Sequence, residues 1–326
     1  MDNVLGECPS VLERLYKLND CSVRLLPGGL INKTFLIIRA DNTKYVLQKL
    51  SSQFGISVTN KVSIVSEHLI NKGLYAPQLV LTDTGDLIGS TSSGNWRLFK
   101  YLEGFTKKVV TTVEDSSELA RVLGSFHLSI QDCAGIPVGQ PKKRGADFQL
   151  ERLAALLKRF PYHASKGEVE LCANMVRKKL KSLPALQSNK QYILHGDPKV
   201  SNFLFSNETP SVKCMIDLDT VGWSQLSWEL ADGFRSWCNS CSEDQSVGVF
   251  DVGIFEASLH SYLNTVKDFF PKEEILCSLD VTAHIFLELS VRFLVDAIEE
   301  QYFGWDSNAF ESASSHNLVR AKGQLT

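Results

Sequence analysis

The chain has 326 residues, a length that fits one large domain or two modest ones. Its hydrophobic content of 44% and charged content of 22% are ordinary for a globular protein, and its net charge of −3 argues against nucleic acid as a main partner. Its apolar runs are too short to span a bilayer, and its first residues lack the basic start and apolar stretch of a secretory signal. We therefore expect a cytoplasmic protein without a membrane partner, with a monomer favoured over an oligomer.

Eight cysteines are scattered along the chain, and only Cys238 and Cys241 have the C-x-x-C spacing of a metal or redox site. A second such pair, or histidines at zinc spacing, would be needed to support that use, and the sequence around them offers neither. Free thiols in a reducing compartment are the expected state.

The first 102 residues are predicted to contain several strands and two helices. Helical periodicity covers residues 11–18 and 58–72, and Gly73 follows the second run as a natural C-terminal cap. Strand-like runs lie twice within residues 21–40, the second at 34–38, and then at 44–50, 78–82 and 96–102. Together these five runs predict an antiparallel meander.

The first bend of this meander contains Gly28 and Gly29, followed by Asn32. Because glycine carries no side chain, such a turn lets backbone amides approach the phosphates of a nucleotide. We expect Gly28, Gly29 and Asn32 to contribute to nucleotide binding, although the glycine pair by itself fits an ordinary hairpin turn as well.

After Glu103 and Gly104 break the last strand, the character of the chain changes to helices. We expect an N-terminal nucleotide-binding lobe at residues 1–102, a hinge at 103–106 and a C-terminal lobe at 107–326. Exposed backbone in the hinge, including that of Glu103, would read the adenine edge. Helices of the C-terminal lobe are expected at 117–130, 147–160, 167–183, 228–237 and through most of 253–298.

The segment from His195 to Asp217 carries the strongest chemical signal. It reads H-x-D-x-K-x-x-N, then an apolar run, then Ile-Asp. A phosphoryl-transfer enzyme needs these groups in this order. Asp197 would orient the acceptor hydroxyl and take its proton late, while Lys199 would place positive charge near the transferring phosphoryl group. Asn202 and Asp217 would offer the oxygen ligands that Mg²⁺ prefers.

A meander of about five strands, a hinge and a helical lobe with a short catalytic hairpin is the plan of a bilobal, protein-kinase-like α+β fold. The cleft between two such lobes is where a nucleotide would lie. The residues thus predict a kinase that uses ATP and Mg²⁺.

Six segments also carry a family resemblance. They are Gly28-Gly-Leu-Ile-Asn-Lys-Thr-Phe, Tyr45-Val-Leu-Gln-Lys, Trp96-Arg-Leu-Phe-Lys-Tyr-Leu-Glu-Gly104, His195-Gly-Asp-Pro-Lys, Met215-Ile-Asp-Leu-Asp-Thr220 and Arg292-Phe-Leu-Val-Asp296. In these segments the chain resembles the aminoglycoside phosphotransferase superfamily nearly from end to end. Its Ile-Asp-Leu-Asp-Thr segment and its ending, Asn317-Leu-Val-Arg-Ala-Lys-Gly-Gln324, are most similar to the N-acetylhexosamine 1-kinase group.

The resemblance implies ATP and Mg²⁺ as co-substrates, and transfer of the γ-phosphoryl group to the anomeric hydroxyl of an N-acetylhexosamine such as GlcNAc or GalNAc. Asp197 corresponds to the catalytic base, and Asn202 and Asp217 correspond to metal ligands. Arg292 and Tyr302 correspond to residues that hold the sugar, a role that suits a fork of donors and a flat ring with one hydroxyl.

Two of these assignments have structural alternatives. Arg292 also fits a helix ion pair with Glu288 or Asp296, each four residues away. Tyr302 also fits an aromatic side chain that covers the core.

The lysine that grips the nucleotide in this family lies near the end of a V-x-x-K strand. Gln48 and Lys49 are the candidates, and they point to opposite faces of a strand. The charge favours Lys49, whereas the shorter V-L-K pattern of relatives favours the register of Gln48. We predict Lys49.

Four residues are expected to support the site. His195 would support the loop backbone, and Asp219, which shares a face with Asp217 on an extended chain, would either assist a metal or hold the loop. One of Glu229 and Asp232 would brace the catalytic loop by hydrogen bonds.

Two other functions fit the same scaffold. A kinase of another small alcohol, such as an aminoglycoside, choline, homoserine or methylthioribose, would use the same catalytic groups. A non-catalytic kinase-like binding module would not need them intact. A protein kinase is disfavoured because the sequence has neither a D-F-G nor an A-P-E motif.

Overall fold

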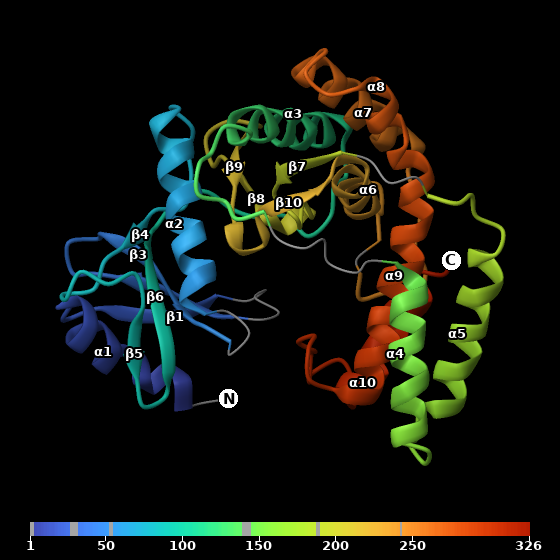
Figure 1. The fold of residues 1–326 in the computed structure, drawn as a ribbon. Coiled ribbons are helices and arrows are strands. Elements are labelled where there is room, and N and C mark those ends of the chain that lie inside the picture. Colours follow the sequence, from blue (N-terminus) through green and yellow to red (C-terminus); the bar gives the residue numbers. More distant parts are fainter. Residues whose placement is uncertain (1–2, 27–31, 52–54, 139–144, 187–189, 242) are drawn as a thin grey trace. The chain divides into compact units, whose positions relative to one another are not determined.

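The computed structural model describes residues 3–26, 32–51, 55–138, 145–186, 190–241 and 243–326 (Figure 1). The chain forms two compact units. Unit 1 comprises the described residues of Met1–Glu103 with Cys133–Gly135 and Ile216–Asp219, and unit 2 comprises Gly104–Asp132, Ile136–Met215 and Thr220–Thr326. The prediction assigned Asp217 and Asp219 to the C-terminal lobe, whereas the structure groups their segment with the N-terminal sheet.

Unit 1 is built on a six-stranded antiparallel sheet in the order β1-β2-β3-β6-β4, with β5 paired to β6. The strands are β1 (Ser22–Leu26), β2 (Lys33–Ile38), β3 (Lys44–Lys49), β4 (Leu79–Val80), β5 (Gly89–Thr91) and β6 (Gly94–Lys100). Each of the five predicted runs overlaps a strand, but β6 lies between β3 and β4, so the predicted meander ends at β3. The addition is β5, whose Gly-Ser-Thr sequence shows no apolar alternation.

Helix α1 (Asn3–Tyr16) covers one face of this sheet. Phe35, Leu47 and Leu98 stand opposite one another on β2, β3 and β6, and they pack in one cluster with Val11 and Leu12 of α1. All five side chains are buried, and each contributes on the order of 1.5–3 kcal/mol. The other face of the strands is therefore the one that remains for polar side chains of the site.

The two helices of unit 1 differ in how well their starts were predicted. Helix α1 begins at Asn3 rather than at residue 11, because Pro9, which reads as a break, is accommodated inside the helix. Helix α2 (Ile56–Asn71) matches the predicted run and ends before Gly73, whose φ of +79° suits a residue without a side chain.

Unit 2 begins where the chain leaves β6. Gly104 has a φ of +157°, and a Cβ at this position would lie 2.4 Å from the carbonyl oxygen of Phe205. The next residue, Phe105, exchanges both backbone hydrogen bonds with Phe205, at 3.1 and 2.8 Å. Glycine at position 104 thus allows the chain to lie against Phe205, the last residue of strand β8 (Phe203–Phe205).

The helical part of unit 2 is organised around α9, a helix of 22 residues. Figure 1 shows α4, α5 and α10 alongside it, and these four helices share one apolar core cluster. The helices of unit 2 are α3 (Val113–Ile130), α4 (Ala146–Arg159), α5 (Lys166–Leu180), α6 (Leu226–Trp237), α7 (Val252–Val266), α8 (Lys272–Leu276), α9 (Ser278–Glu299) and α10 (Ala313–Gly323).

Two short antiparallel strand pairs flank the segments that contain His195–Asn202 and Asp217–Asp219. Strand β7 (Gln191–Leu194) pairs with β10 (Gly222–Gln225), and β8 (Phe203–Phe205) pairs with β9 (Val212–Met215). The 3₁₀ turns η1 (Val200–Asn202) and η2 (Leu218–Thr220) precede β8 and follow β9.

The predicted α+β class, with an antiparallel sheet and a mainly helical part, is confirmed. Helix α10 was not predicted as a helix; a capping box between Ser312 and Ser315 starts it, and its packing on α9 buries it. Within the described part of the chain, every helix is too short or too polar to traverse a lipid bilayer.

Candidate active site

The loop between β7 and η1 carries His195, Gly196 and Asp197. Gly196 has a φ of +86°, a conformation that residues with side chains rarely adopt. A Cβ there would lie 2.6 Å from the carbonyl oxygen of Thr220, whose hydroxyl in turn donates to the carbonyl oxygen of His195 (2.9 Å). The glycine of the H-G-D motif is therefore required by the close packing of two backbone segments.

Gly196→Ala is expected to lower the free energy of unfolding by at least about 1–3 kcal/mol, the usual cost of a left-handed conformation in a residue with a side chain. The clash with Thr220 adds to this cost and displaces Asp197. Urea unfolding measures the effect, with Gly167→Ala as a control, because a Cβ at Gly167 in α5 meets no atom within 4 Å. Equal stability of Gly196→Ala and the wild type would contradict this packing.

Glu229 of α6 braces the same loop. Its carboxylate is 2% exposed and accepts the backbone N–H groups of His195 and Gly196, both at 2.9 Å. The ring of His127 lies 3.4 Å from Glu229, and its other nitrogen lies 2.8 Å from the hydroxyl of Tyr262. Three elements, α3, α6 and α7, thus meet under the catalytic loop.

The charges of this buried pair follow from their surroundings. Burial alone would raise the pKa of Glu229, but the hydrogen bond from His127 and the N–H donor of Gly196 outweigh burial and lower that pKa. Burial lowers the pKa of His127, with Glu229 opposing the shift. A neutral His127 that donates to Glu229 and accepts from Tyr262 satisfies all three groups.

Asp197 is held in place by its own loop. Its Oδ2 lies 2.7 Å from Lys199 Nζ, and Asn202 Nδ2 donates both to this oxygen (3.0 Å) and to the Asp197 carbonyl (2.8 Å). The side chain is 26% exposed, so it is supported but accessible. Burial disfavours its charge, but Lys199 outweighs burial and holds the pKa of Asp197 below its ordinary value.

Helix α6 supports the loop with two further contacts. The indole N–H of Trp237 donates to the Pro198 carbonyl (2.8 Å), and Ser236 Oγ accepts the N–H of Val200 (3.1 Å). Asp232, in contrast, pairs with Arg235 of the same helix (2.9 Å). Of the two acids expected to brace the loop, Glu229 makes the hydrogen bonds to its backbone, and Asp232 acts on Arg235.

The segment of Asp217 and Asp219 lies on the sheet of unit 1. Asp217 has a φ of +63°, in the left-handed region that aspartate adopts more readily than most residues with side chains. Asp219 is 5% exposed and receives two hydrogen bonds from Arg97, at 2.7 and 2.8 Å. Asn32, which was predicted to bind the nucleotide, donates to Asp219 (3.3 Å) and accepts the N–H of Ser51 (3.0 Å). Of the two roles considered for Asp219, holding the loop is the one its contacts support.

The choice of Lys49 over Gln48 has to be corrected. Lys49 lies on the sheet face that α1 covers, where its ammonium pairs with Glu7 (2.9 Å) and lies 5.2 Å from the ring centroid of Trp96. Gln48 lies on the opposite face and accepts a hydrogen bond from Arg97 (2.9 Å). The prediction of Lys49 relied on its positive charge, but Glu7 of α1 is the partner of that charge.

Two other nucleotide assignments stay predictions. Gly28 and Gly29 lie outside the described residues. Glu103 accepts a hydrogen bond from Lys44 (2.7 Å), and its side chain is 58% exposed, which leaves its expected backbone role untouched.

Arg292 and Tyr302 lie close together at the end of α9, with the guanidinium carbon 5.8 Å from the ring centroid. The acids considered as partners of Arg292 have other contacts. Asp296 accepts the N–H groups of residues 301–303 at 2.7–2.9 Å, and Glu288 accepts the N–H of Gly145 (2.9 Å).

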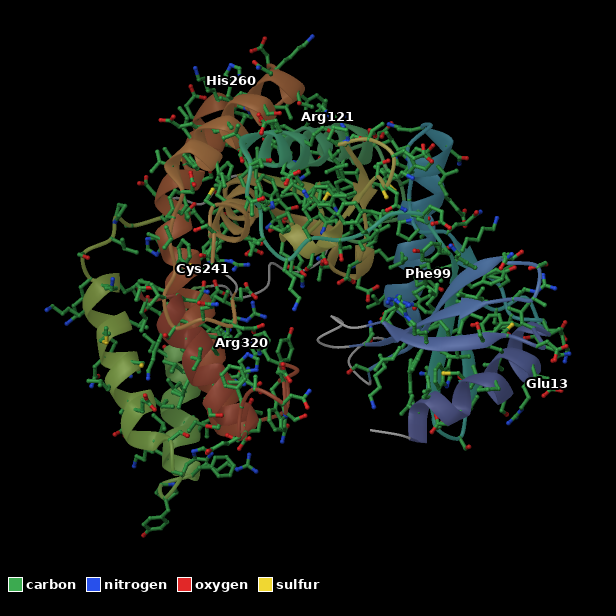
Figure 2. The ribbon with its side chains drawn as sticks, turned by 180° about the vertical axis from the view of Figure 1, so that it is seen from behind. Glu13, Phe99, Arg121, Cys241, His260 and Arg320 are labelled. Atoms are coloured by element: carbon green, nitrogen blue, oxygen red, sulfur yellow. The ribbon has the colours of Figure 1, made fainter. Side chains whose placement is uncertain are left out.

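The loop that presents Tyr302 is held from two sides. The buried Asp296 fixes its start, and Arg320 of α10, labelled in Figure 2, donates to the carbonyl of Gly304 (2.9 Å). Tyr302 itself is 36% exposed, so its ring is open on one side. Its ring also lies edge-on to that of Phe303 (4.8 Å), which packs on the core of unit 2, so the alternative of an aromatic that covers the core is also consistent with this position.

Several supporting residues were not predicted, among them Arg97, His127 and Trp237. Arg97 offers a signal in hindsight, because it is a charged residue in the middle of the apolar strand Trp96-Arg-Leu-Phe. A fully buried arginine needs an acid as partner. His127 and Trp237 sit in helices whose patterns reveal their burial but not their partners.

Comparison with known proteins bears on this arrangement. A model of the phosphotransferase enzyme family (APH) matches residues 22–254. A homoserine kinase from Brucella anthropi is 24% identical over 216 residues, so that the match spans about three fifths, 61%, of each chain.

Solved structures show the same fold at low identity. An amicoumacin kinase in complex with AMP-PNP, Ca²⁺ and Ami is 13% identical, with a TM-score of 0.64 over 100% of this chain and 93% of that one. A microcompartment-associated aminopropanol kinase is 14% identical, with a TM-score of 0.62 over 98% of this chain and 95% of that one. The family match covers well over half of the chain, and the chain therefore belongs to the APH phosphotransferase enzyme family.

Proposed function

We propose that this protein is an ATP-dependent kinase that transfers the γ-phosphoryl group to a hydroxyl of a small molecule. The observation that carries the proposal is the Asp197 loop, in which an accessible carboxylate is fixed by Lys199, Asn202 and the Glu229 brace. Family membership supports it, because the same activity is named for the homoserine kinase that the chain resembles.

The donor set suits a hard divalent cation such as Mg²⁺. Both contacts of the Asn202 side chain to Asp197 use its NH₂ group, so the amide oxygen is directed away from them. Asn202 precedes β8 and Asp217 follows β9, and Phe203 and Met215 at those strand ends pair with each other. Asn202 and Asp217 would hold the metal, which would offset the negative charge of the phosphate groups.

The residues of the loop act on the acceptor and on the moving group. Asp197 orients the acceptor hydroxyl toward the γ-phosphorus and takes its proton as the new P–O bond forms and the bond to ADP breaks. Lys199 offsets charge on the transferring phosphoryl oxygens. His195 contributes through its backbone, which Glu229 and Thr220 fix.

For the acceptor we propose an N-acetylhexosamine such as GlcNAc or GalNAc, phosphorylated at its anomeric hydroxyl. Support comes from the resemblance of the motifs and from the pair of Arg292 and Tyr302, which offers hydrogen-bond donors beside a partly exposed ring. An amino alcohol is the second candidate, because homoserine kinase and aminopropanol kinase are among the similar proteins.

A panel of acceptors separates these candidates. ADP release from ATP and Mg²⁺ is measured with GlcNAc, GalNAc, homoserine, choline, methylthioribose and an aminoglycoside, against a no-acceptor control. We expect turnover with a hexosamine, and a fall of kcat/KM for it in Arg292→Met by about 10-fold or more. Turnover with homoserine alone would reassign the acceptor. Thermal stabilisation by ATP and Mg²⁺ without turnover on any acceptor would indicate a binding module.

The lowered pKa of Asp197 has a consequence for the pH profile. A carboxylate with a depressed pKa stays ionised as the pH falls through the ordinary pKa of aspartate, about 3.9. Its negative charge is lost only at a lower pH. The acid limb of kcat/KM should therefore lie below pH 4 in the wild type. In Lys199→Met, which lacks the opposing cation, the limb should move to higher pH. An unchanged limb in this variant would show that Lys199 does not control the charge of Asp197.

A further inference from the structure

A polar row crosses the sheet face opposite α1. Thr34, Gln48 and Arg97 are consecutive partners in the register of β2, β3 and β6. Arg97 Nε donates to Gln48 Oε1 (2.9 Å), and Gln48 Nε2 donates to Thr34 Oγ1 (3.3 Å). Because the contact with Gln48 uses only Nε, both terminal nitrogens of the Arg97 guanidinium remain available for another partner.

Those nitrogens hold Asp219. Nη1 and Nη2 of Arg97 each donate to one carboxylate oxygen, at 2.7 and 2.8 Å, and Asn32 adds a third donor. Arg97 is 2% exposed and Asp219 is 5% exposed. A guanidinium matches a carboxylate with two parallel hydrogen bonds, which fixes its orientation as well as its position. Both carboxylate oxygens of Asp219 thus accept hydrogen bonds from Arg97 of strand β6.

The anchored residue lies two positions after the proposed metal ligand. Asp217 adopts a φ of +63°, in the left-handed region that among residues with side chains is occupied mainly by asparagine and aspartate. The turn η2 begins at the next residue, Leu218, which is 2% exposed. A buried apolar side chain and a bidentate ion pair therefore immobilise the chain directly after Asp217.

We propose that Arg97 is a positioning residue for metal binding: through Asp219 it holds the backbone that aims the Asp217 carboxylate at the cation. This inference rests on the proposed function, because it concerns the metal of that site. In this proposal Gln48 orients the guanidinium of Arg97, and Asp219 anchors the segment that carries Asp217. Arg97 would not bind the metal itself; it would act through its ion pair with Asp219, which fixes the position of Asp217.

The test separates this role from folding. Arg97→Met alone leaves the charge of Asp219 buried without its cation and is expected to destabilise the protein. The double variant Arg97→Met/Asp219→Leu removes both charges and puts an apolar pair in their place, so its melting temperature should stay near that of the wild type. A matched control is Arg152→Met/Glu299→Leu, which removes an ion pair between α4 and α9.

The readout is Mn²⁺ affinity in the presence of AMP-PNP, measured by electron paramagnetic resonance without any acceptor. We expect the double variant to bind Mn²⁺ about 10–100-fold more weakly than the wild type, as Asp217→Asn does, and the control to bind normally. Arg97→Lys, which keeps the charge without the fork, should fall between them. Wild-type affinity in a folded double variant would overturn the inference.

The outcomes also separate the inference from the proposed function. An Arg97-dependent Mn²⁺ affinity in a protein that phosphorylates no acceptor would support the positioning role and refute the kinase activity. A wild-type protein that binds no Mn²⁺ with AMP-PNP would refute both.

Discussion

Asp197→Asn is expected to lower kcat by about 10²- to 10⁴-fold, the usual contribution of a group that accepts a proton in the transition state. Asparagine keeps the size of the side chain and can still contact Lys199 and Asn202, which lie 2.7 and 3.0 Å from the carboxylate. The variant should therefore fold and bind nucleotide like the wild type while failing in the chemical step.

Steady-state kinetics and nucleotide titration together measure this effect. Asp83→Asn is a suitable control, because that side chain is 52% exposed and pairs only at the surface with Lys17. Loss of nucleotide affinity in Asp197→Asn would assign the residue to binding. Near-normal turnover in that variant would remove it from the mechanism.

Glu229→Ala is expected to have the largest effect on stability. It leaves the N–H groups of His195 and Gly196 without their acceptor inside the protein, at about 1–3 kcal/mol for each. The free energy of unfolding should fall by about 2–6 kcal/mol, and kcat should fall with it because the loop that carries Asp197 loses its brace. Glu229→Gln keeps one acceptor oxygen, so its free energy of unfolding and its kcat should lie between those of the wild type and Glu229→Ala.

Urea unfolding and kcat measured well below the melting temperature test this prediction. Glu170→Ala serves as control, because that carboxylate on α5 is 49% exposed. A Glu229→Ala variant with wild-type stability would show that the loop amides find another acceptor. A folded variant with wild-type kcat would show that the brace is not needed to position Asp197.

The fold could be predicted where local pattern decides it. Each of the five strand runs predicted in the first 102 residues overlaps a strand, because turn residues and alternation mark them, and α2 ends where Gly73 predicts. The pattern failed for α1, whose Pro9 reads as a break, and for α10, whose helix depends on packing against α9. Contacts distant in sequence decide both of these elements.

The part of the site formed by neighbours in sequence could be predicted, whereas the part formed by contacts distant in sequence could not. The catalytic loop follows from one continuous motif, and its residues Asp197, Lys199 and Asn202 contact one another as neighbours in sequence. The choice between Gln48 and Lys49 depends on which face α1 covers, and the charge of Lys49 is taken up by Glu7 of that helix. The Arg97–Asp219 pair joins residues 122 apart, a separation at which local patterns carry no information.

The most direct test of the central claim is transfer of label from ATP with ³²P in the γ position to the acceptor panel. The account predicts that labelled acceptor accumulates with the wild type, that ADP forms in equal amount, and that Asp197→Asn abolishes both while still binding ATP. Label that stays in ATP, or appears only as inorganic phosphate with every acceptor, would contradict the account.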